Sequence, residues 1–326
     1  QLPAESIERI EVIDNPSAKF SAEGSAGIIN IVLKKERKSG YYGSMQAGAD
    51  TRGGANTSFN INYNSSKLDA YFNIGYRHRE NVGRNESTQD NIANGIPVSY
   101  ERHFTEETRR GNMLFARTGL TWHATDKDDF SVNGMLFTGK NKGYSSTPYY
   151  YGAYTAAGEV MERIRQIDSY SGGPMNMYNV EFNYRHNFTD KHFIDFIVSH
   201  NRWSSDNDNI YQDYIHYMDE TLPSSSSYQS RPLDINNHRT EVRADYENPL
   251  TEHLKLEAGY NGSFSRENTP QYSYEADNWD GMNLAEDQDY FNRFTYDNNV
   301  HALYTTLSYN KDKFGLMAGL RGEYWR

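Results

Sequence analysis

Six carboxylates gather in residues 275–294 against a single basic residue, Arg293. Such a cluster could bind a divalent cation or attract a cationic ligand. The spacing does not follow an EF-hand loop, because Trp279 falls where the ligand at the third position belongs. We therefore interpret this stretch as a solvated acidic loop, and we interpret the run 206–209 in the same way. The acidic residues are Glu275, Asp277, Asp280, Glu286, Asp287 and Asp289.

Aromatic residues form a second group, in residues 141–174, beside glycines and serines. Clustered aromatic rings can stack on sugars, on aromatic siderophore groups or on peptide side chains. The same rings could instead pack the base of their own loop. The candidate ligand-binding residues are Tyr149, Tyr150, Tyr151 and Tyr154, together with Tyr274 and Trp279 from the acidic stretch.

No pattern typical of an enzyme is present. The ten histidines are scattered, without a pair at metal-ligand spacing, and the chain has no cysteine. It has neither a His-Glu-x-x-His motif nor a phosphate-binding glycine loop. Nothing in the order of serines, histidines and aspartates indicates a catalytic triad. We expect no catalytic residue, no metal and no cofactor.

Composition narrows the class of protein further. Lys and Arg number 33 and Asp and Glu 44, so the formal net charge is 33 − 44 = −11, which disfavours a nucleic-acid partner. The mean hydropathy is −0.89, and no run of 18 apolar residues could form a membrane-spanning helix. A membrane β-barrel remains compatible, because its strands alternate polar and apolar residues. The chain begins at Gln1 rather than Met, so we expect it to be processed or excised.

Apolar and polar residues alternate with period two along many short segments, which predicts β-strands. Examples are 59–63, 69–77, 114–122, 178–185, 241–246, 255–261 and 316–324. We expect eleven strands, beginning near 41, 55, 68, 109, 130, 175, 192, 236, 254, 295 and 314. Tight turns alternate with long polar stretches at about 81–108, 141–174, 211–235 and 275–294. Short turns at one end and large loops at the other are typical of outer-membrane barrels.

An aromatic residue stands just before most of the tight turns, always in the apolar phase of its strand. This placement predicts an interfacial girdle, although tyrosine and tryptophan also favour strands in general. The residues are Tyr63, Trp122, Tyr184, Tyr246 and Tyr309, followed across two turns by Phe130 and Phe314.

The residues that alternate with the apolar ones along each strand carry the charges, and they are predicted to face a water-filled lumen. Turning one arginine toward lipid near mid-bilayer would cost about 2–4 kcal/mol, so turning four would cost roughly 8–16 kcal/mol. That sum equals the stability of a whole domain. The lumen set is Arg117, Arg185, Arg243 and Arg321, with Glu181, Glu241, Asp245, Glu257 and Glu323.

The first forty residues differ from the rest and carry a family resemblance. Residues 7–13, then 15–20 (Asn-Pro-Ser-Ala-Lys-Phe), then 22–31 (Ala-Glu-Gly-Ser-Ala-Gly-Ile-Ile-Asn-Ile) resemble the end of the plug domain of a TonB-dependent receptor, in the version typical of Bacteroidota. The resemblance implies that residues 1–39 are the C-terminal part of an α/β plug domain. It also implies that residues 40–326 are the N-terminal half of a transmembrane antiparallel β-barrel. The family has 22 strands, so eleven would be half a barrel, and an odd count also indicates truncation.

The resemblance further implies uptake of a bulky, scarce ligand at the cell outer membrane of a Gram-negative bacterium. The TonB complex would couple this uptake to the inner-membrane proton-motive force through a segment that would precede Gln1. It also implies that plug charges seat against the barrel wall, which makes Arg9 and Glu11 candidate partners of Glu241 and Glu257. The alternative is that Arg9 and Glu11 are ordinary solvated charges.

Three functions stay open at this stage. The first is a TonB-dependent receptor for a glycan, siderophore, cobalamin or peptide, with outer-membrane lipid as its surroundings and a surface lipoprotein as a further partner that the sequence leaves undecided. The second is a structural or assembly barrel of an outer-membrane complex without transport. The third is a soluble all-β carbohydrate-binding protein, which requires the apolar strand faces to pack on each other.

Overall fold

The computed structural model describes residues 7–13, 28–33 and 39–326. Two antiparallel strands, β1 (Ile7–Ile13) and β2 (Ile28–Leu33), form a small sheet of their own. All the other strands belong to one large antiparallel sheet. Within the described residues, no helix has the length and apolar character needed to cross a membrane.

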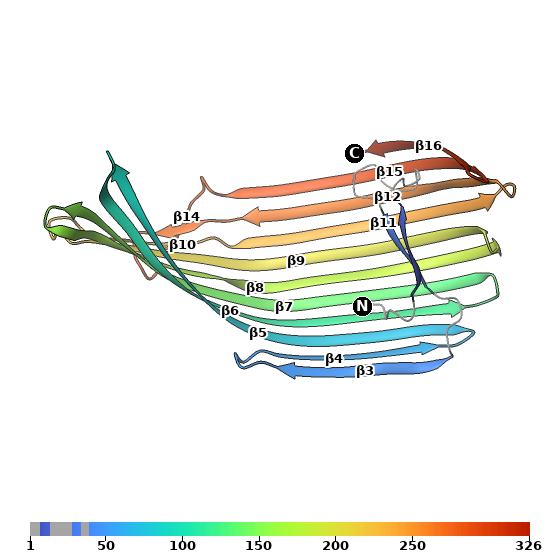
Figure 1. Cartoon of the computed structure of the whole chain (residues 1–326), viewed down its shortest axis with the longest axis horizontal. Coiled ribbons are helices and arrows are strands. Elements are labelled where there is room, and N and C mark those ends of the chain that lie inside the picture. Colours follow the sequence, from blue (N-terminus) through green and yellow to red (C-terminus); the bar gives the residue numbers. More distant parts are fainter. Residues whose placement is uncertain (1–6, 14–27, 34–38) are drawn as a thin grey trace.

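The large sheet is a meander in which each main strand pairs with the next one along the chain. Eleven strands make up this path among the described residues, and they form one curved layer (Figure 1). Three short strands, β10, β13 and β14, lie off the path. The bounds of the path are β3 (Gly40–Ala49), β4 (Ala55–Asn64), β5 (Leu68–Ala93), β6 (Ile96–His123), β7 (Asp128–Thr155), β8 (Gly158–Thr189), β9 (His192–Tyr217), β11 (Leu233–Pro249), β12 (Leu254–Gln271), β15 (Asn292–Lys311) and β16 (Phe314–Trp325).

The predicted number of main strands is confirmed, but two of the predicted loops are wrong. Residues 81–108 and 141–174 continue the strand ladders of β5–β6 and β7–β8 as extended hairpins. The first hairpin ends in a two-residue turn at Asn94 and Gly95, both with positive φ (52° and 79°). The strands predicted to begin near 109 and 175 therefore begin at Ile96 and Gly158. These extensions are polar on both faces, so they lack the apolar alternation that marks the rest of each strand.

The remaining two stretches only partly form strands. β10 (Ser225–Ser230) pairs with β9, while β13 (Tyr274–Ala276) joins β10 to β14 (Ala285–Glu286). Short segments of sheet thus continue into the predicted loops 211–235 and 275–294.

The register places polar residues opposite polar residues on one side of the sheet, which we call the polar face. One row on this face runs from Asn60 through Asn73 to Arg117, and a second runs from Asn133 through Glu181 to Ser199. The other side, the apolar face, carries rows of large apolar residues. One such row comprises Tyr63, Ala70, Leu120, Val132, Phe182, Val198 and Val242.

The predicted girdle residues lie on the apolar face beside the short turns. Phe130 stacks between Trp122 and Tyr184, with ring centroids 5.8 and 4.7 Å away. The ring of Tyr309 lies 6.3 Å from that of Phe314 on the adjacent strand. Such stacked rings at one height are typical of a membrane interface.

Polar pairs mark the far limit of the apolar face. The ring of His78 hydrogen-bonds Asn112 at 2.7 Å, and His200 hydrogen-bonds Thr240 at 2.9 Å. On β6 the apolar phase runs from Trp122 to Leu114, nine residues that would span roughly 23 Å at about 3.3 Å per residue and a tilt of about 40°. This height fits the apolar band of a membrane barrel, about 25 Å tall.

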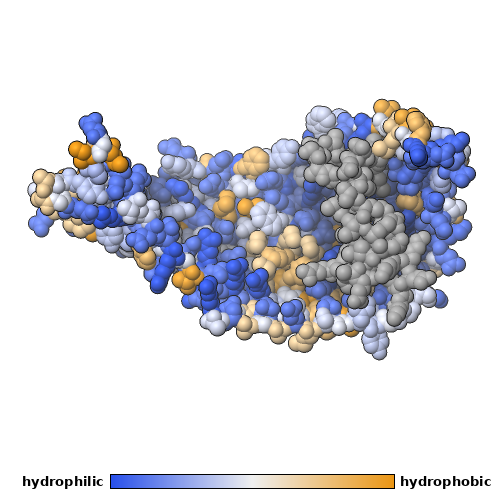
Figure 2. All heavy atoms as spheres, viewed as in Figure 1, coloured by the Kyte–Doolittle hydropathy of each residue, from blue (hydrophilic) through white to orange (hydrophobic). Residues whose placement is uncertain are grey.

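Few side chains are buried, because the sheet forms a single layer. Among the described residues, only Tyr100, Ala276, Ala302 and Tyr304 are buried apolar side chains. Large residues of the apolar face stay exposed, including Trp122 at 52% and Leu120 at 45%. The face seen in Figure 2 is largely hydrophilic. The soluble alternative is therefore wrong, since it requires the apolar faces to pack on each other.

Replacing Val180 by Arg should lower the free energy of unfolding of the intact protein in lipid bilayers by about 2–4 kcal/mol, because Val180 lies mid-way along the apolar face. Urea titration followed by tryptophan fluorescence measures this change. Asn179→Arg is the matched control: it adds the same charge one residue away, on the polar face, and should cost less than about 1 kcal/mol. Equal costs for the two variants would contradict the assigned faces.

Candidate functional site: polar face and extended hairpins

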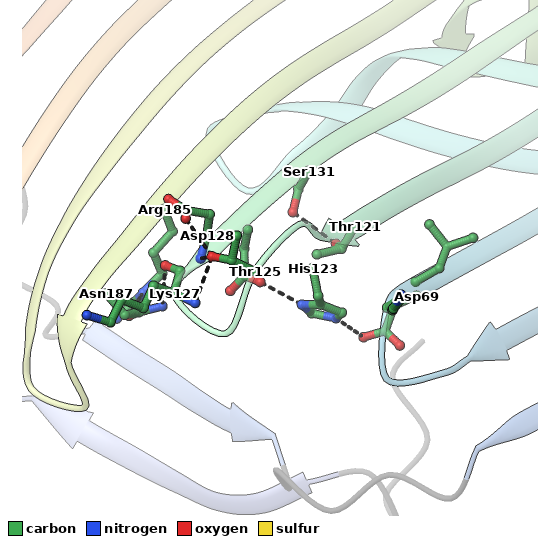
Figure 3. Close-up of polar contacts among 12 residues, drawn as sticks. Asp69, Thr121, His123, Thr125, Lys127, Asp128, Ser131, Arg185 and Asn187 are labelled. Carbon is green, nitrogen blue, oxygen red and sulfur yellow. Dashed lines mark hydrogen bonds and ion pairs between the residues drawn. The ribbon is translucent and has the colours of Figure 1, made fainter.

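At the short-turn end, the polar face carries a network that links neighbouring strands (Figure 3). The ring of His123 on β6 contacts Asp129 of β7 at 2.6 Å and Asp69 of β5 at 3.4 Å. Farther along, Arg185 on β8 pairs with Asp195 of β9 at 3.3 Å and stacks over the ring of Phe193. These contacts join β5, β6 and β7, and separately β8 and β9, at the same end of the sheet.

The predicted lumen charges all lie on the polar face. Asp245 is only 3% exposed, and accepts hydrogen bonds from Arg243 at 2.9 Å and from the Tyr304 hydroxyl. Arg321 pairs with Glu323, two residues along the same strand, at 2.6 Å. Most of these charges are thus compensated locally within the wall.

The predicted plug–barrel contacts are only partly described. Arg9 and Glu11 lie on β1, opposite Val32 and Asn30, and their side chains lie outside the described part. Glu241 pairs with Arg239 at 2.6 Å, and Glu257 pairs with Lys255 at 3.3 Å. Both glutamates thus have a basic partner on their own strand, and their contact with β1 stays a prediction.

Strand alternation divides the predicted tyrosine cluster between two faces. Tyr149 and Tyr151 share the phase of the polar face, whereas Tyr150 and Tyr154 lie on the opposite side. The rings of Tyr149 and Tyr151 stack with centroids 6.2 Å apart, and His103 lies 4.7 Å from Tyr149. This arrangement is a ladder of rings along one side of the paired extensions of β6 and β7.

Arginines from β8 flank this ladder. The guanidinium of Arg163 lies 4.2 Å from the centroid of the Tyr151 ring, as in a cation–π contact. Arg165, opposite Tyr149 in the register, forms a bidentate pair with Asp213 of β9. We call His103, Tyr149, Tyr151, Arg163 and Arg165 the tyrosine–arginine ladder.

The other side of the same hairpins carries a closed set of pairs. Arg102 donates to both oxygens of Glu159, at 2.9 and 2.7 Å, and stacks over Tyr100. This guanidinium holds the pKa of Glu159 below its usual range. The hydroxyl of Tyr154 donates to Asp90 at 2.8 Å, a bond that raises the pKa of the phenol. Because these groups satisfy one another, they stiffen the extension.

An open groove of about 720 Å³ lies on the same side as Tyr150, nearer the membrane. Tyr144, Tyr170 and Tyr228 line it, together with Gln212. The amide of Gln212 donates to the backbone oxygen of Trp279, whose ring meets Tyr214 edge-on. Trp279 therefore reaches the border of this groove.

The other aromatic candidate of the acidic stretch lies elsewhere. Tyr274 on β13 stacks on Tyr272 and pairs with Ser230 in the register. The carboxylate of Glu275 accepts a hydrogen bond from Gln229 at 2.8 Å. Across the described ranges, no group of three or more His, Asp or Glu side chains is placed to hold a metal ion.

Sequence reasoning missed His103, Arg163 and Arg165. A signal was present for the arginines, because Arg163 and Arg165 alternate with Ile164 with period two. The prediction of a loop over 141–174 hid this alternation.

Comparison with known proteins finds a family model that matches the C-terminal part of the chain. Residues 186–326 match the model of the outer membrane protein beta-barrel family, and these residues form β9 to β16 of the sheet. The protein carries an outer-membrane β-barrel domain. It is located in the outer membrane of a Gram-negative bacterium, as the sequence predicts, so its apolar face contacts lipid and its polar face lines the lumen.

Comparisons with curated proteins and with solved structures add little to this match. No curated protein matches the chain significantly. The structure of the ferric-catecholate import receptor Fiu from E. coli K12, in its open form, aligns over 98% of this barrel chain and 78% of its own, at 8% identity. The TM-score is 0.16.

Asp128, at the turn between β6 and β7, should make the barrel acid-sensitive. Hydrogen bonds from His186, Thr125 and Tyr184 lower the pKa of Asp128 to about 2. A carboxylate with a lowered pKa stabilises the fold above its usual pKa near 3.8, and this contribution disappears as the pH falls toward about 2.

The thermal midpoint of wild type should therefore fall more steeply between pH 4 and 2 than that of Asp128→Asn, when both are followed by circular dichroism. Asp126→Asn, in the same turn, removes an equal charge and serves as the control. Parallel curves for wild type and Asp128→Asn would contradict the assignment.

Proposed function

We propose that the protein is an outer-membrane receptor that captures a bulky ligand on its external hairpins and passes it along the lumen. The tyrosine–arginine ladder carries this proposal. It lies in the lumen phase of β7 and β8, so the surface that stacks rings is continuous with the polar lumen wall below it. Short turns mark the periplasmic end of a barrel, which places the extended hairpins outside the cell.

The ladder has the chemistry to hold a flat or hydroxyl-rich ligand. Stacked tyrosines offer ring faces, and histidine and arginine offer hydrogen-bond donors beside them. Among the described residues, Arg163 has no carboxylate within ion-pair distance, whereas Arg165 is paired with Asp213. Arg163 therefore supplies the uncompensated positive charge. This combination suits a glycan, siderophore, cobalamin or peptide with an anionic or carbonyl group.

Coupling to the TonB complex rests on the plug resemblance of residues 7–31. In agreement with it, β1 and β2 form a sheet separate from the barrel wall. We propose that residues 1–39 end a plug and that 40–326 form barrel wall. The ligand would then pass when TonB rearranges the plug, and uptake would depend on the proton-motive force.

A structural role without transport is the second candidate. The tip of the β5–β6 hairpin exposes Ile92 and Ile96, each at 66%. Exposed apolar residues at a loop tip suit contact with another protein. If a variant with serine at both positions still takes up ligand, contact with another protein through these residues is distinct from transport.

Tyr149→Ala combined with Tyr151→Ala should weaken ligand binding by about tenfold, since each stacking contact contributes about 0.5–1.5 kcal/mol. The measurement is fluorescence titration of the intact receptor against oligosaccharides, ferric siderophores, cobalamin and peptides, followed by uptake of whichever compound binds. Tyr150→Ala, on the opposite side of the same strand, is the matched control and should change binding less than about twofold.

Coupling to TonB is tested by a separate experiment. In cells lacking TonB, binding should persist and uptake should stop. Uptake that continues without TonB would contradict the coupling, and an equal loss of binding in Tyr150→Ala would contradict the site.

A further inference from the structure

A row of basic side chains crosses three strands on the lipid-facing side of the barrel. Arg202 of β9 lies opposite His238 of β11, and His238 lies opposite Arg266 of β12. All three have the phase of the apolar face, because Val198 lies four residues before Arg202 on β9 and Val242 lies four residues after His238 on β11. Arg266 shares this phase as the register partner of His238. Tyr178 of β8 ends the row on one side, and Asp297 of β15 ends it on the other.

Like charges directly opposite each other in a sheet are destabilising. Asp297 compensates Arg266, at 3.6 Å. Arg202 donates from Nε to the side chain of Asn236, at 3.1 Å, and has no carboxylate within ion-pair distance in the described part of the chain. The row therefore has positive charge in excess at Arg202, with the imidazole of His238 beside it as a hydrogen-bonding group.

A polar depression of about 390 Å³ opens beside Arg202. It is lined by the side-chain amides of Asn176, Asn236 and Asn268 and by Ser204, groups that hydrogen-bond hydroxyls and phosphate oxygens. Asp206 and Asp234 close its outer end, four residues beyond Arg202 and His238, or about 13 Å farther along the strands. Arg293, opposite Pro270 in the register, also lines this outer end. The two carboxylates disfavour an anion there, whereas Arg202 at the other end has no carboxylate within ion-pair distance among the described residues.

The height of the row identifies the source of that ligand. It lies just above the apolar band, at the end away from the short periplasmic turns, which is the headgroup level of the outer leaflet. Basic clusters at this level bind the headgroups of anionic lipids. A lipid there presents its phosphate to Arg202 and His238 while its acyl chains lie along Val198 and Val242.

We propose that Arg202, His238 and the adjoining depression form a binding site for the phosphorylated headgroup of an outer-leaflet lipid. This site faces lipid and is independent of ligand uptake through the lumen. The amide-lined depression takes the hydroxyl-rich part of the headgroup.

The test uses the intact protein in detergent micelles, with native mass spectrometry to count retained lipid. The probes are diphosphorylated lipid A, the same lipid after removal of its phosphates, and inorganic phosphate alone. Wild type should retain the phosphorylated lipid at least about tenfold better than the dephosphorylated one, because charge-assisted hydrogen bonds are lost with the phosphates. Arg202→Gln combined with His238→Asn should abolish that preference.

Arg84→Gln is the matched control. Arg84 has the same phase on β5, but lies farther out and pairs with Glu106 at 3.1 Å. It should leave lipid retention unchanged. Circular dichroism of each variant confirms that the barrel is folded before lipid is compared.

Equal retention of the two lipids by wild type would overturn the proposal, as would an unchanged preference in the double variant. Inorganic phosphate that binds as tightly as the lipid would also overturn it, since a free anion would then be the ligand.

Discussion

The hydrocarbon layer of a membrane supplies no hydrogen bonds, so each backbone group in a membrane-spanning strand must find its partner in the neighbouring strand. This constraint explains the meander, in which every main strand pairs with its successor along nearly its whole length. It also fixes which side chains share a face, since successive residues point to opposite sides of a strand. The apolar and polar faces therefore follow directly from the ladder.

Outside the membrane the pairing of strands continues, but there both faces of the sheet contact water. The β5–β6 and β7–β8 hairpins run far beyond the apolar band with water on both sides. Their side chains can therefore serve different purposes on each face. One face carries the tyrosine–arginine ladder, and the other carries pairs such as Arg102 with Glu159 that satisfy each other. A hairpin stiffened on one face can present unsatisfied groups on the other.

The lumen wall shows how a barrel can hold many charges without a strong field. Several ion pairs join residues two apart on one strand, and therefore on one face, including Arg243 with Asp245 and Arg321 with Glu323. Pairs of this kind that are exposed, such as Arg239 with Glu241, add little stability. Their effect is to cancel charge locally, so that a ligand meets a hydrophilic surface with few uncompensated charges. The basic row facing lipid differs in this respect, because Arg202 has a hydrogen bond there but no carboxylate partner among the described residues.

The sequence by itself determined the class of fold, the phase of each strand and the membrane location. Period two and the aromatic residues before the turns are local signals, so Trp122, Phe130 and Tyr184 could be placed on one face without knowing which strands pair. The tertiary structure decided where the strands end and which residues meet across them. Residues 141–174 are polar on both sides, so no local contrast in hydropathy shows that they form a ladder.

Only pairing between distant residues showed that Tyr149 and Tyr150 stand on a strand, where successive side chains face opposite sides, and set Arg163 beside Tyr151. For the same reason, only the register could align Arg202, His238 and Arg266, which lie on three strands, into one row. Sequence alternation assigns a face to each residue. The position of that residue along the barrel depends on hydrogen bonds to its neighbours, which a single strand does not contain.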